Sequence, residues 1–300
     1  MALVSMESIF RHALEEKYSV GYFESWNLES TYAVVRAAEQ ARSPVIIGCC
    51  GEYVENPARR YREHLSVYAA MVKAVAEEAS VPVATLLNEA DEVETVYRGI
   101  RAGFGMVMFA DDEMPLAELE SVQKRIVEVA HACNIAVEAE VGALPMSHLE
   151  SGHLDQGWKT DPDRAAQFVQ RTGVDALAVS IGNVHLLEGR KAELDMPLLE
   201  RLSKAVKVPL VLHGGTGIDQ ALFREAAKLR VAKVNVGAGL KRVVIEAERR
   251  YFAETEVSKM NPNHVLGTGG PADLGVRGQE AIMQEVVSYI RAFGGENKAR

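Results

Sequence analysis

Short apolar runs alternate with longer amphipathic segments along the whole chain, and this alternation constrains the fold more than any other feature. Eight of these runs are predicted strands, at residues 19–23, 45–49, 83–87, 106–109, 135–140, 176–181, 210–213 and 233–236. Each gap between them holds a helix-like stretch, such as residues 29–41 or 221–229. Eight strand–helix repeats predict an α/β fold of the (β/α)8 TIM barrel class. A doubly wound open sheet is the competitor, but it would normally show fewer strands and often a G-x-G-x-x-G turn, which is absent after the first run.

The C-terminal part of the chain continues past the eighth predicted strand. It is predicted to form a helix from about Gly239, a polar loop over residues 260–275 and a final helix over residues 279–293. Barrels of about 250 residues are routinely one domain. We therefore expect residues 1–300 to form a single barrel domain with a C-terminal helical extension.

Composition narrows the protein class. Hydrophobic residues make up 48% and charged residues 25% of the chain, which argues against a disordered or membrane protein, and no apolar run approaches the ~18–20 residues of a membrane helix. The N-terminus has no apolar signal-peptide core, and three cysteines cannot form a disulfide framework, so a cytoplasmic location is predicted. The net charge is −9 and no basic tract is dense, so a nucleic-acid partner is not expected.

Chemistry in such barrels lies at the carboxyl ends of the strands. This rule selects a set of residues dense in metal ligands and proton-transfer groups: Glu24, Cys50, Asn88, Glu89, Asp111, Asp112, Glu138, Glu140, His185, His213 and Asn235.

His213 closes an apolar run and is followed by a glycine-rich turn. Gly214, Gly215 and Gly217 would let backbone N–H groups face a bound anion, and a second glycine turn follows Val236 next door. The loops after strands seven and eight are where barrels often hold phosphate. The alternative for His213 is a core histidine bonded to a backbone carbonyl.

Two further pairs suggest a metal centre. His185 lies one strand before His213, and two neutral imidazoles suit zinc or another transition metal. Glu138 and Glu140 share one face of a strand, where burial favours a nearby metal. The alternatives are a polar loop residue for His185 and, for the glutamates, a salt bridge to a lysine of a neighbouring strand.

A segment without periodicity follows the fifth predicted strand and contains His148, Glu150 and His153. Such a stretch is typical of a mobile loop that carries an acid–base group. The alternative is a solvated loop with no role in chemistry.

Four motifs in the same order, EAEVG, AVSIGNVH, LVLHGGTG and KVNVGAGLK, resemble those of the class II metal-dependent aldolases. These are the fructose-1,6- and tagatose-1,6-bisphosphate aldolases, and the likeness covers nearly the whole chain. The resemblance implies a (β/α)8 barrel and a dimer or higher oligomer. It also implies a divalent metal, usually zinc, which polarises the substrate ketone and stabilises the enediolate left when the C3–C4 bond breaks.

The resemblance assigns roles to matching positions. His185 and His213 match two of the three metal histidines, and Glu140 matches the family's glutamate near the metal. Asn235 matches the asparagine that contacts the bound ketone or enediolate. The turns that would hold phosphate and substrate are matched by Gly214, Gly215 and Thr216, and by Val236 and Gly237 beside Asn235.

Several positions depart from the family pattern. Asn88 and Glu89 stand where the family has Asp-His, so an amide replaces the proton donor and a carboxylate replaces the third metal histidine. Glu24 replaces the first-strand asparagine. Leu186 and Ala238 replace a glycine and a threonine that help to hold phosphate. In the loop after the fifth strand, Pro145-Met146 replaces Gly-Gly, and His148 aligns with the loop's catalytic glutamate. Ala110 stands in place of an aspartate that follows the fourth strand.

The sequence therefore predicts a metal-dependent carbon–carbon lyase that cleaves a ketose or ketose phosphate by a retro-aldol reaction. His185, His213 and Glu89 would hold the metal with Glu140 close by, zinc being the first choice and manganese, iron or cobalt alternatives. His148, Glu150 or Glu24 would move the proton, because Asn88 cannot. A homodimer or homotetramer is expected. The rival interpretations are a non-catalytic assembly subunit and a metal-dependent isomerase or lyase acting on an unphosphorylated substrate.

Overall fold

Eight parallel strands close into a barrel in the computed structural model, which describes residues 2–148, 153–185, 187 and 191–299. The barrel strands follow the order β1-β10-β9-β8-β5-β4-β3-β2 around the ring. Their bounds are β1 (Val20–Glu24), β2 (Val45–Cys50), β3 (Val83–Ala90), β4 (Met106–Phe109), β5 (Ala136–Val141), β8 (Ala176–Val179), β9 (Leu210–Leu212) and β10 (Val231–Val236). The predicted (β/α)8 barrel is confirmed, with strand ends that differ by up to three residues.

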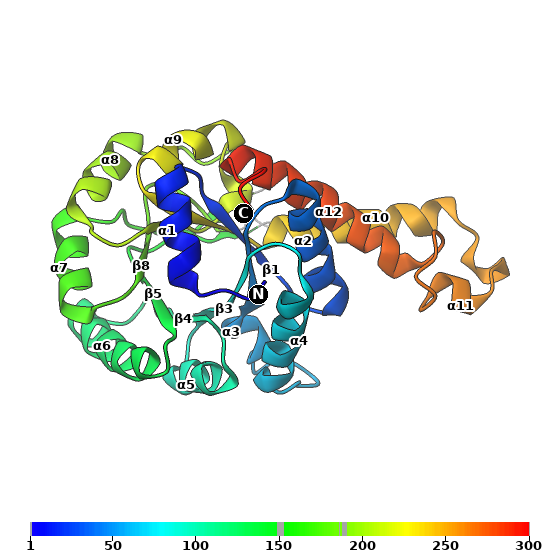
Figure 1. Cartoon of the computed structure of the whole chain (residues 1–300), viewed down its shortest axis with the longest axis horizontal. Helices are drawn as coiled ribbons and strands as arrows, with labels where there is room; N and C mark the ends of the chain where they lie inside the picture. The colour runs from blue at the N-terminus through cyan, green and yellow to red at the C-terminus, as the bar shows by residue number, and fades with distance from the viewer. Residues whose placement is uncertain (1, 149–152, 186, 188–190, 300) are drawn as a thin grey trace.

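Helices surround the barrel (Figure 1). They are α2 (Leu28–Ala41), α3 (Gly51–Val54), α4 (Leu65–Glu78), α5 (Val93–Ala102), α6 (Leu116–Ala132), α7 (Pro162–Thr172), α8 (Met196–Ala205) and α9 (Phe223–Lys228). Their apolar faces pack on the outer faces of the strands in one large core. The N-terminal helix α1 (Met6–Glu16) packs Met6, Ile9 and Phe10 against lumen residues at the amino ends of the strands. This end of the barrel is thereby filled by apolar side chains, and polar chemistry is left to the carboxyl ends.

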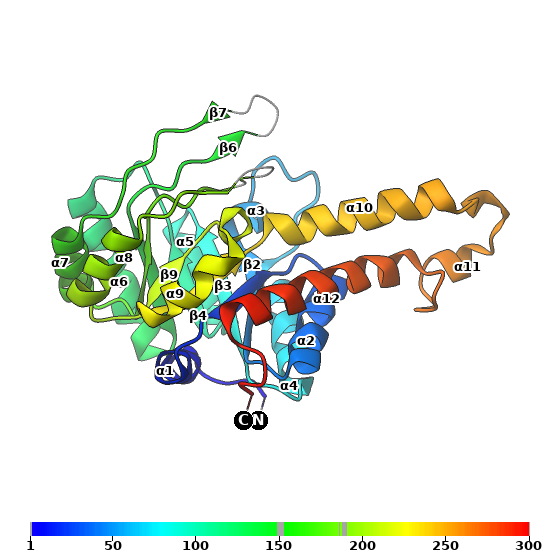
Figure 2. The same cartoon turned by 90° about the horizontal axis from the view of Figure 1, so that it is seen from above.

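The C-terminal extension forms an arm (Figures 1 and 2). Helix α10 (Ala238–Glu254) leads outward, α11 (Pro262–Val265) lies at the tip, and α12 (Leu274–Phe293) returns to pack on α10 and α2. The predicted polar loop over 260–275 is wrong in part, because α11 lies within it and α12 begins five residues earlier than expected. Asp273 caps α12 by accepting from the Gly275 N–H at 2.9 Å, a cap that the glycine-rich sequence obscured.

The segment after β5 is not a structureless loop. Strands β6 (Ser147–His148) and β7 (His153–Leu154) pair antiparallel and stand above the carboxyl end of the barrel (Figure 2). The base of this hairpin is tied to the barrel, because the Ser147 N–H donates to the His185 carbonyl at 2.9 Å and the His185 N–H donates to the Pro145 carbonyl at 3.0 Å. Within the described residues, none of the helices is both long and apolar enough to cross a membrane.

Candidate active site

A cavity of about 370 Å³ opens at the carboxyl ends of the strands, where the fold predicts chemistry. It is lined by Tyr22, Glu24, Tyr53, Asn88, Glu89, Met146, His185, His213, Gly214, Thr216, Asn235, Val236, Gly237, Ala238 and Lys241. The predicted residues Glu24, Asn88, Glu89, His185, His213 and Asn235 therefore share one cavity.

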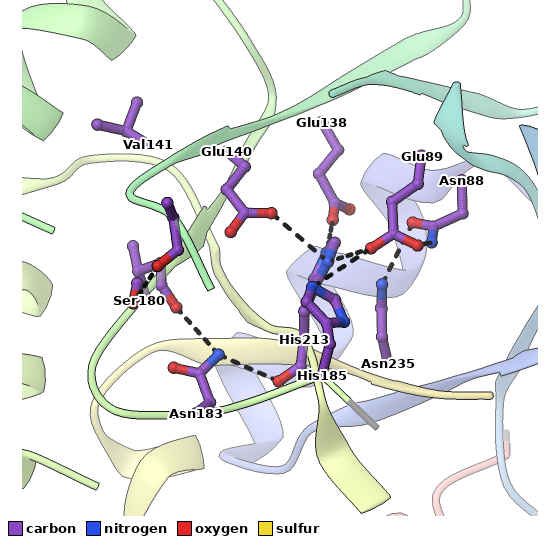
Figure 3. Close-up of polar contacts among 12 residues, drawn as sticks. Asn88, Glu89, Glu138, Glu140, Val141, Ser180, Asn183, His185, His213 and Asn235 are labelled. Atoms are coloured by element: carbon purple, nitrogen blue, oxygen red, sulfur yellow. Dashed lines mark hydrogen bonds and ion pairs between the residues drawn. The ribbon is translucent and has the colours of Figure 1, made fainter. Parts of the chain in front are cut away.

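His213 follows directly after β9 and lies at the centre of a carboxylate cluster (Figure 3). Its side chain is 1% exposed, with Nε2 2.9 Å from Glu138 Oε1 and Nδ1 2.8 Å from Glu89 Oε1. Burial alone would lower the pKa of this imidazole, but the hydrogen bonds to Glu138 and Glu89 raise its pKa to about 10. Among the described residues, the His213 ring is bonded to two carboxylates and to no backbone carbonyl, so the core-histidine alternative does not fit the structure.

Glu138 and Lys233 form an ion pair beneath His213, and we call these two residues the floor pair. Both side chains are fully buried, and Lys233 Nζ lies 2.8 Å from Glu138 Oε2. Lys233 also donates to Asn235 Oδ1 at 2.6 Å and lies 5.4 Å from the centre of the Tyr22 ring. Burial would raise the pKa of the Glu138 carboxyl, yet Lys233 and His213 hold it below its ordinary value. The salt-bridge alternative thus holds for Glu138, although Lys233 lies across the barrel and not on a neighbouring strand.

Glu140 lies two residues after Glu138 on β5, and its side chain is beside His213. Its Oε2 atom is 3.7 Å from His213 Nδ1, and among the described residues its buried Oε1 atom has no hydrogen-bond partner. Burial, with neighbouring carboxylates, raises the pKa of Glu140 to about 8.

Glu89 is aimed into the cavity by an irregularity in β3. The pairing register of β3 with β4 shifts between Leu87 and Ala90, and Glu89 has a φ of 45°, in the left-handed region. Its Oε2 atom accepts from Asn88 Nδ2 at 2.7 Å. Burial would raise the pKa of this carboxyl, but the hydrogen bond and charge of His213 lower it to about 2. Glu89 is therefore an ionised carboxylate directed at the two histidines.

The ligand atoms of Glu89, His185 and His213 all lie within 4.8 Å of one another. Glu89 Oε1 is 2.8 Å from His213 Nδ1 and 4.0 Å from His185 Nε2. A metal bound at about 2.0–2.2 Å by each atom needs ligand atoms roughly 3–4 Å apart. Two imidazoles and one carboxylate at these separations fit a divalent cation, and Glu140 lies beside the set without belonging to it.

Asn88 and Asn235 connect this cluster with the floor pair. Asn235 Nδ2 donates to Asn88 Oδ1 at 3.2 Å, while Asn235 Oδ1 accepts from Lys233. A chain of hydrogen bonds therefore runs from Glu89 through the two amides to Lys233, and it fixes which atom of each amide can face a ligand.

A second ion pair, Glu24 with Lys241, forms one wall of the cavity, and we call it the wall pair. Lys241 Nζ lies 2.7 Å from Glu24 Oε1, with side-chain exposures of 34% and 11%. The ammonium also lies 4.4 Å from the centre of the Tyr53 ring. Burial raises the pKa of the Glu24 carboxyl, and the charge of Lys241 opposes this shift.

The glycine turn after His213 is required by packing. Gly214 has a φ of 68°, and a Cβ there would lie 2.4 Å from the Val184 carbonyl oxygen. A Cβ on Gly215 would lie 2.7 Å from the Asn235 carbonyl oxygen. Thr216 Oγ1 accepts from the Gly239 N–H at 3.2 Å, which joins this turn to the start of α10. These glycines thus have a steric explanation that needs no anion.

The predicted catalytic residue His148 is not among the described residues that line this cavity. His148 is 49% exposed on the hairpin, with its Nε2 atom 2.9 Å from Asp155 Oδ1. Glu150 lies outside the described residues, as does Leu186.

Sequence reasoning missed Lys233 and Lys241. Lys233 is two residues before Asn235, so the two share a face of β10, and a lysine inside an apolar strand requires a buried anion. This lysine was therefore visible in the sequence as a candidate partner for a buried carboxylate. Lys241 lies on a helix, where only the fold brings it over Glu24.

Comparisons with known proteins match this chain along nearly its whole length. The family model of class-II fructose-bisphosphate aldolases matches residues 4–298. A probable fructose-bisphosphate aldolase of Bacillus subtilis is 36% identical over all of both chains. A fructose-bisphosphate aldolase of Geobacillus stearothermophilus is 34% identical over all of this chain and 99% of that one. The crystal structure of the YdjI aldolase from Escherichia coli K12 has a TM-score of 0.79 and 29% identity, covering 99% of this chain and 100% of that one.

Proposed function

The chain belongs to the class II fructose-bisphosphate aldolase family and is a metal-dependent aldolase, a carbon–carbon lyase, and we propose that Glu89, His185 and His213 hold its divalent metal. The observation that carries this proposal is the convergence of their three ligand atoms within 4.8 Å. Glu89 then fills the place of the histidine that it replaces. A bound divalent cation would supply Lewis-acid stabilisation of negative charge on a ketone oxygen during retro-aldol cleavage.

Glu138 would orient His213 for this role. A ligating histidine usually donates its second ring N–H to a carboxylate, which fixes the tautomer. Here the His213 Nε2–H would donate to Glu138, and Nδ1 would remain free to bind. Lys233 holds Glu138 ionised and in place.

The two amides would orient the substrate. Asn88 and Asn235 lie beside Glu89 and line the cavity, and we propose that they contact the oxygens next to the bond that breaks. Gly214 and Thr216 of the first glycine turn line the cavity, as do Val236 and Gly237 of the second, and we propose that these two turns bound the substrate on the side of α10.

For the proton that the reaction moves, we propose His148. Asn88 has no acid proton to give, and Asp155 is placed to orient the His148 ring. The base of the hairpin is bonded to the backbone of the proposed ligand His185, which couples the hairpin to the metal site. Movement of the hairpin toward the cavity would bring the imidazole to the substrate.

The rival interpretations are not favoured, because the full-length relatives carry aldolase names. The direct test is elemental analysis of the purified protein, followed by a retro-aldol panel of sugar phosphates and unphosphorylated ketoses. We expect one divalent metal per chain, zinc first with manganese, iron or cobalt as alternatives, and cleavage that a chelator abolishes. Metal-free protein with no chelator-sensitive cleavage would contradict the proposal.

We propose further that residues 1–300 act as one domain in a cytoplasmic homodimer or homotetramer. The arm exposes large apolar side chains, with Ile245 53%, Phe252 54% and Leu266 64% exposed, which suits a subunit contact. Light scattering on the purified protein measures the assembly, and a monomer would contradict it.

A further inference from the structure

The wall pair lies against the two turns to which the sequence assigns phosphate binding. A Cβ placed on Gly237 would lie 2.3 Å from Glu24 Oε2, so the carboxylate lies directly over this glycine. Gly237 is the N-cap residue of the 17-residue helix α10. The Thr216 hydroxyl reaches the same helix start through the Gly239 N–H. Both turns therefore meet at a place already occupied by a carboxylate.

Lys241 forms an ion pair with this Glu24 carboxylate. Its Nζ atom lies 2.7 Å from Glu24 Oε1, 4.4 Å from the Tyr53 ring centre and 5.9 Å from the Trp26 ring centre. An ammonium held in this way has its charge balanced by the protein itself. A helix start and a lysine would otherwise attract an external anion.

We propose that Glu24 selects the substrate by acting as a built-in anion at the α10 end of the cavity, so that this end accepts a neutral hydroxyl group and disfavours a phosphate ester. A phosphate placed on the Gly237 turn would bring its negative charge next to the Glu24 carboxylate, and like charges at such distances repel. A sugar hydroxyl can instead donate to Glu24 and accept from Lys241, which satisfies both groups. The ligand class is thus a ketose whose terminus at this wall is not phosphorylated.

This inference rests on the proposed function for the identity of the pocket as a ketose site. It differs from that function in naming the chemistry of one end of the substrate. Glu24 would be a specificity residue that touches the substrate, with no part in holding the metal.

The test compares the metal-loaded full-length protein with its Glu24→Gln variant. Gln keeps the size of the side chain, removes the negative charge and frees Lys241 to meet an anion. Calorimetric titration with inorganic phosphate should show at least about tenfold tighter binding by the variant, a change of about 1.4 kcal/mol. The ratio of kcat/KM for fructose 1-phosphate to that for fructose should rise by a similar factor.

Two further variants control for charge and for folding. Glu246→Gln removes the same charge from the exposed side of α10, where Glu246 pairs with Arg249, and should leave phosphate affinity unchanged. Lys241→Met leaves Glu24 unbalanced and should weaken phosphate binding further. Metal content and circular dichroism of each variant verify that the site is intact.

The outcomes separate this inference from the proposed function. Unchanged or weaker phosphate binding by Glu24→Gln, with metal retained, overturns the inference even if ketoses are cleaved. Tighter phosphate binding with no cleavage of either ketose supports the inference and counts against the proposed retro-aldol activity. Strong phosphate binding by the unaltered protein also overturns it.

Discussion

The floor pair and the wall pair contain the same two side chains, a glutamate and a lysine, yet they occupy different surroundings in one cavity. Glu138 and Lys233 are fully buried and bonded to a proposed metal ligand. In the wall pair, Glu24 is largely buried and lies against Gly237 at the start of α10, whereas the Lys241 side chain is 34% exposed and lies over the Tyr53 ring. The difference shows that the extent of burial decides what each ion pair can do. The floor pair is fully buried and can act only through other residues of the protein, whereas the wall pair lines the cavity and can contact a ligand.

Stability should separate the two pairs most strongly. Lys233→Met leaves Glu138 buried without its ammonium partner, and breaking a buried pair typically costs about 3 kcal/mol or more. Lys241→Met removes a lysine that is 34% exposed, and the remaining Glu24 carboxyl can take up a proton because burial already raises its pKa, so we expect a smaller loss of about 1 kcal/mol. Urea unfolding of the metal-free proteins measures both free energies, and equal losses would remove the distinction.

Metal binding should depend on Glu89, which neither pair includes. Glu89→Gln keeps the size and removes the charge, and we expect metal affinity to fall about 100-fold or more, beyond the usual effect of outer partners, with activity falling in parallel. Added metal should partly restore both. Glu89→His should keep the metal and shift preference toward zinc. Elemental analysis after dialysis measures occupancy, and a Gln variant that binds metal as tightly as the parent would show that Glu89 is not a ligand.

Turnover should depend on a residue outside both pairs. If His148 carries the proton, His148→Ala should lower kcat by about 100-fold, the lower end of general acid–base contributions, with bound metal unchanged. Steady-state kinetics with parallel metal analysis make the test, and His264→Ala, which removes an exposed histidine from α11 at the tip of the arm, is the matched control. An unchanged kcat would assign the proton to another group.

The smallest expected effect is on metal affinity, and it compares Glu138 of the floor pair with Glu24 of the wall pair. Glu138→Gln should lower metal affinity by roughly 10-fold, because an outer partner of a ligating histidine loses its charge. Glu24→Gln should leave metal affinity unchanged, since Glu24 contacts none of the three proposed ligands in the described structure. Competition with a metallochromic chelator measures both affinities, and a loss in Glu24→Gln would show that the wall pair also supports the metal.

Much of the fold could be predicted because alternation is a local property. Eight apolar runs separated by amphipathic stretches fix the barrel, and the strand-end rule then gathers His185, His213 and Asn235 into one cavity. The start of α12 was missed because Gly275 and Gly278 resemble a loop, whereas Asp273 caps the helix and Gly278 packs closely on Val244 of α10.

The site was less predictable where contacts cross the barrel. A lysine inside the apolar strand β10 indicates a buried anion, but the local sequence does not indicate that this anion is Glu138, three strands around the ring. The same holds for Glu24 and Lys241, which are 217 residues apart in the chain. The hairpin of β6 and β7 was missed because two-residue strands are too short to show alternation.

The floor pair also has a consequence for how the chain closes into a barrel. Glu138 and Lys233 are 95 residues apart, so bringing them together closes a long segment of chain and costs conformational entropy. A slip of β10 by one residue would turn Lys233 toward the outer helices, where an apolar core would surround a charge without a partner. The pair therefore penalises a one-residue slip of β10, and it links the correct alignment of this strand to the correct position of Glu138 beside His213.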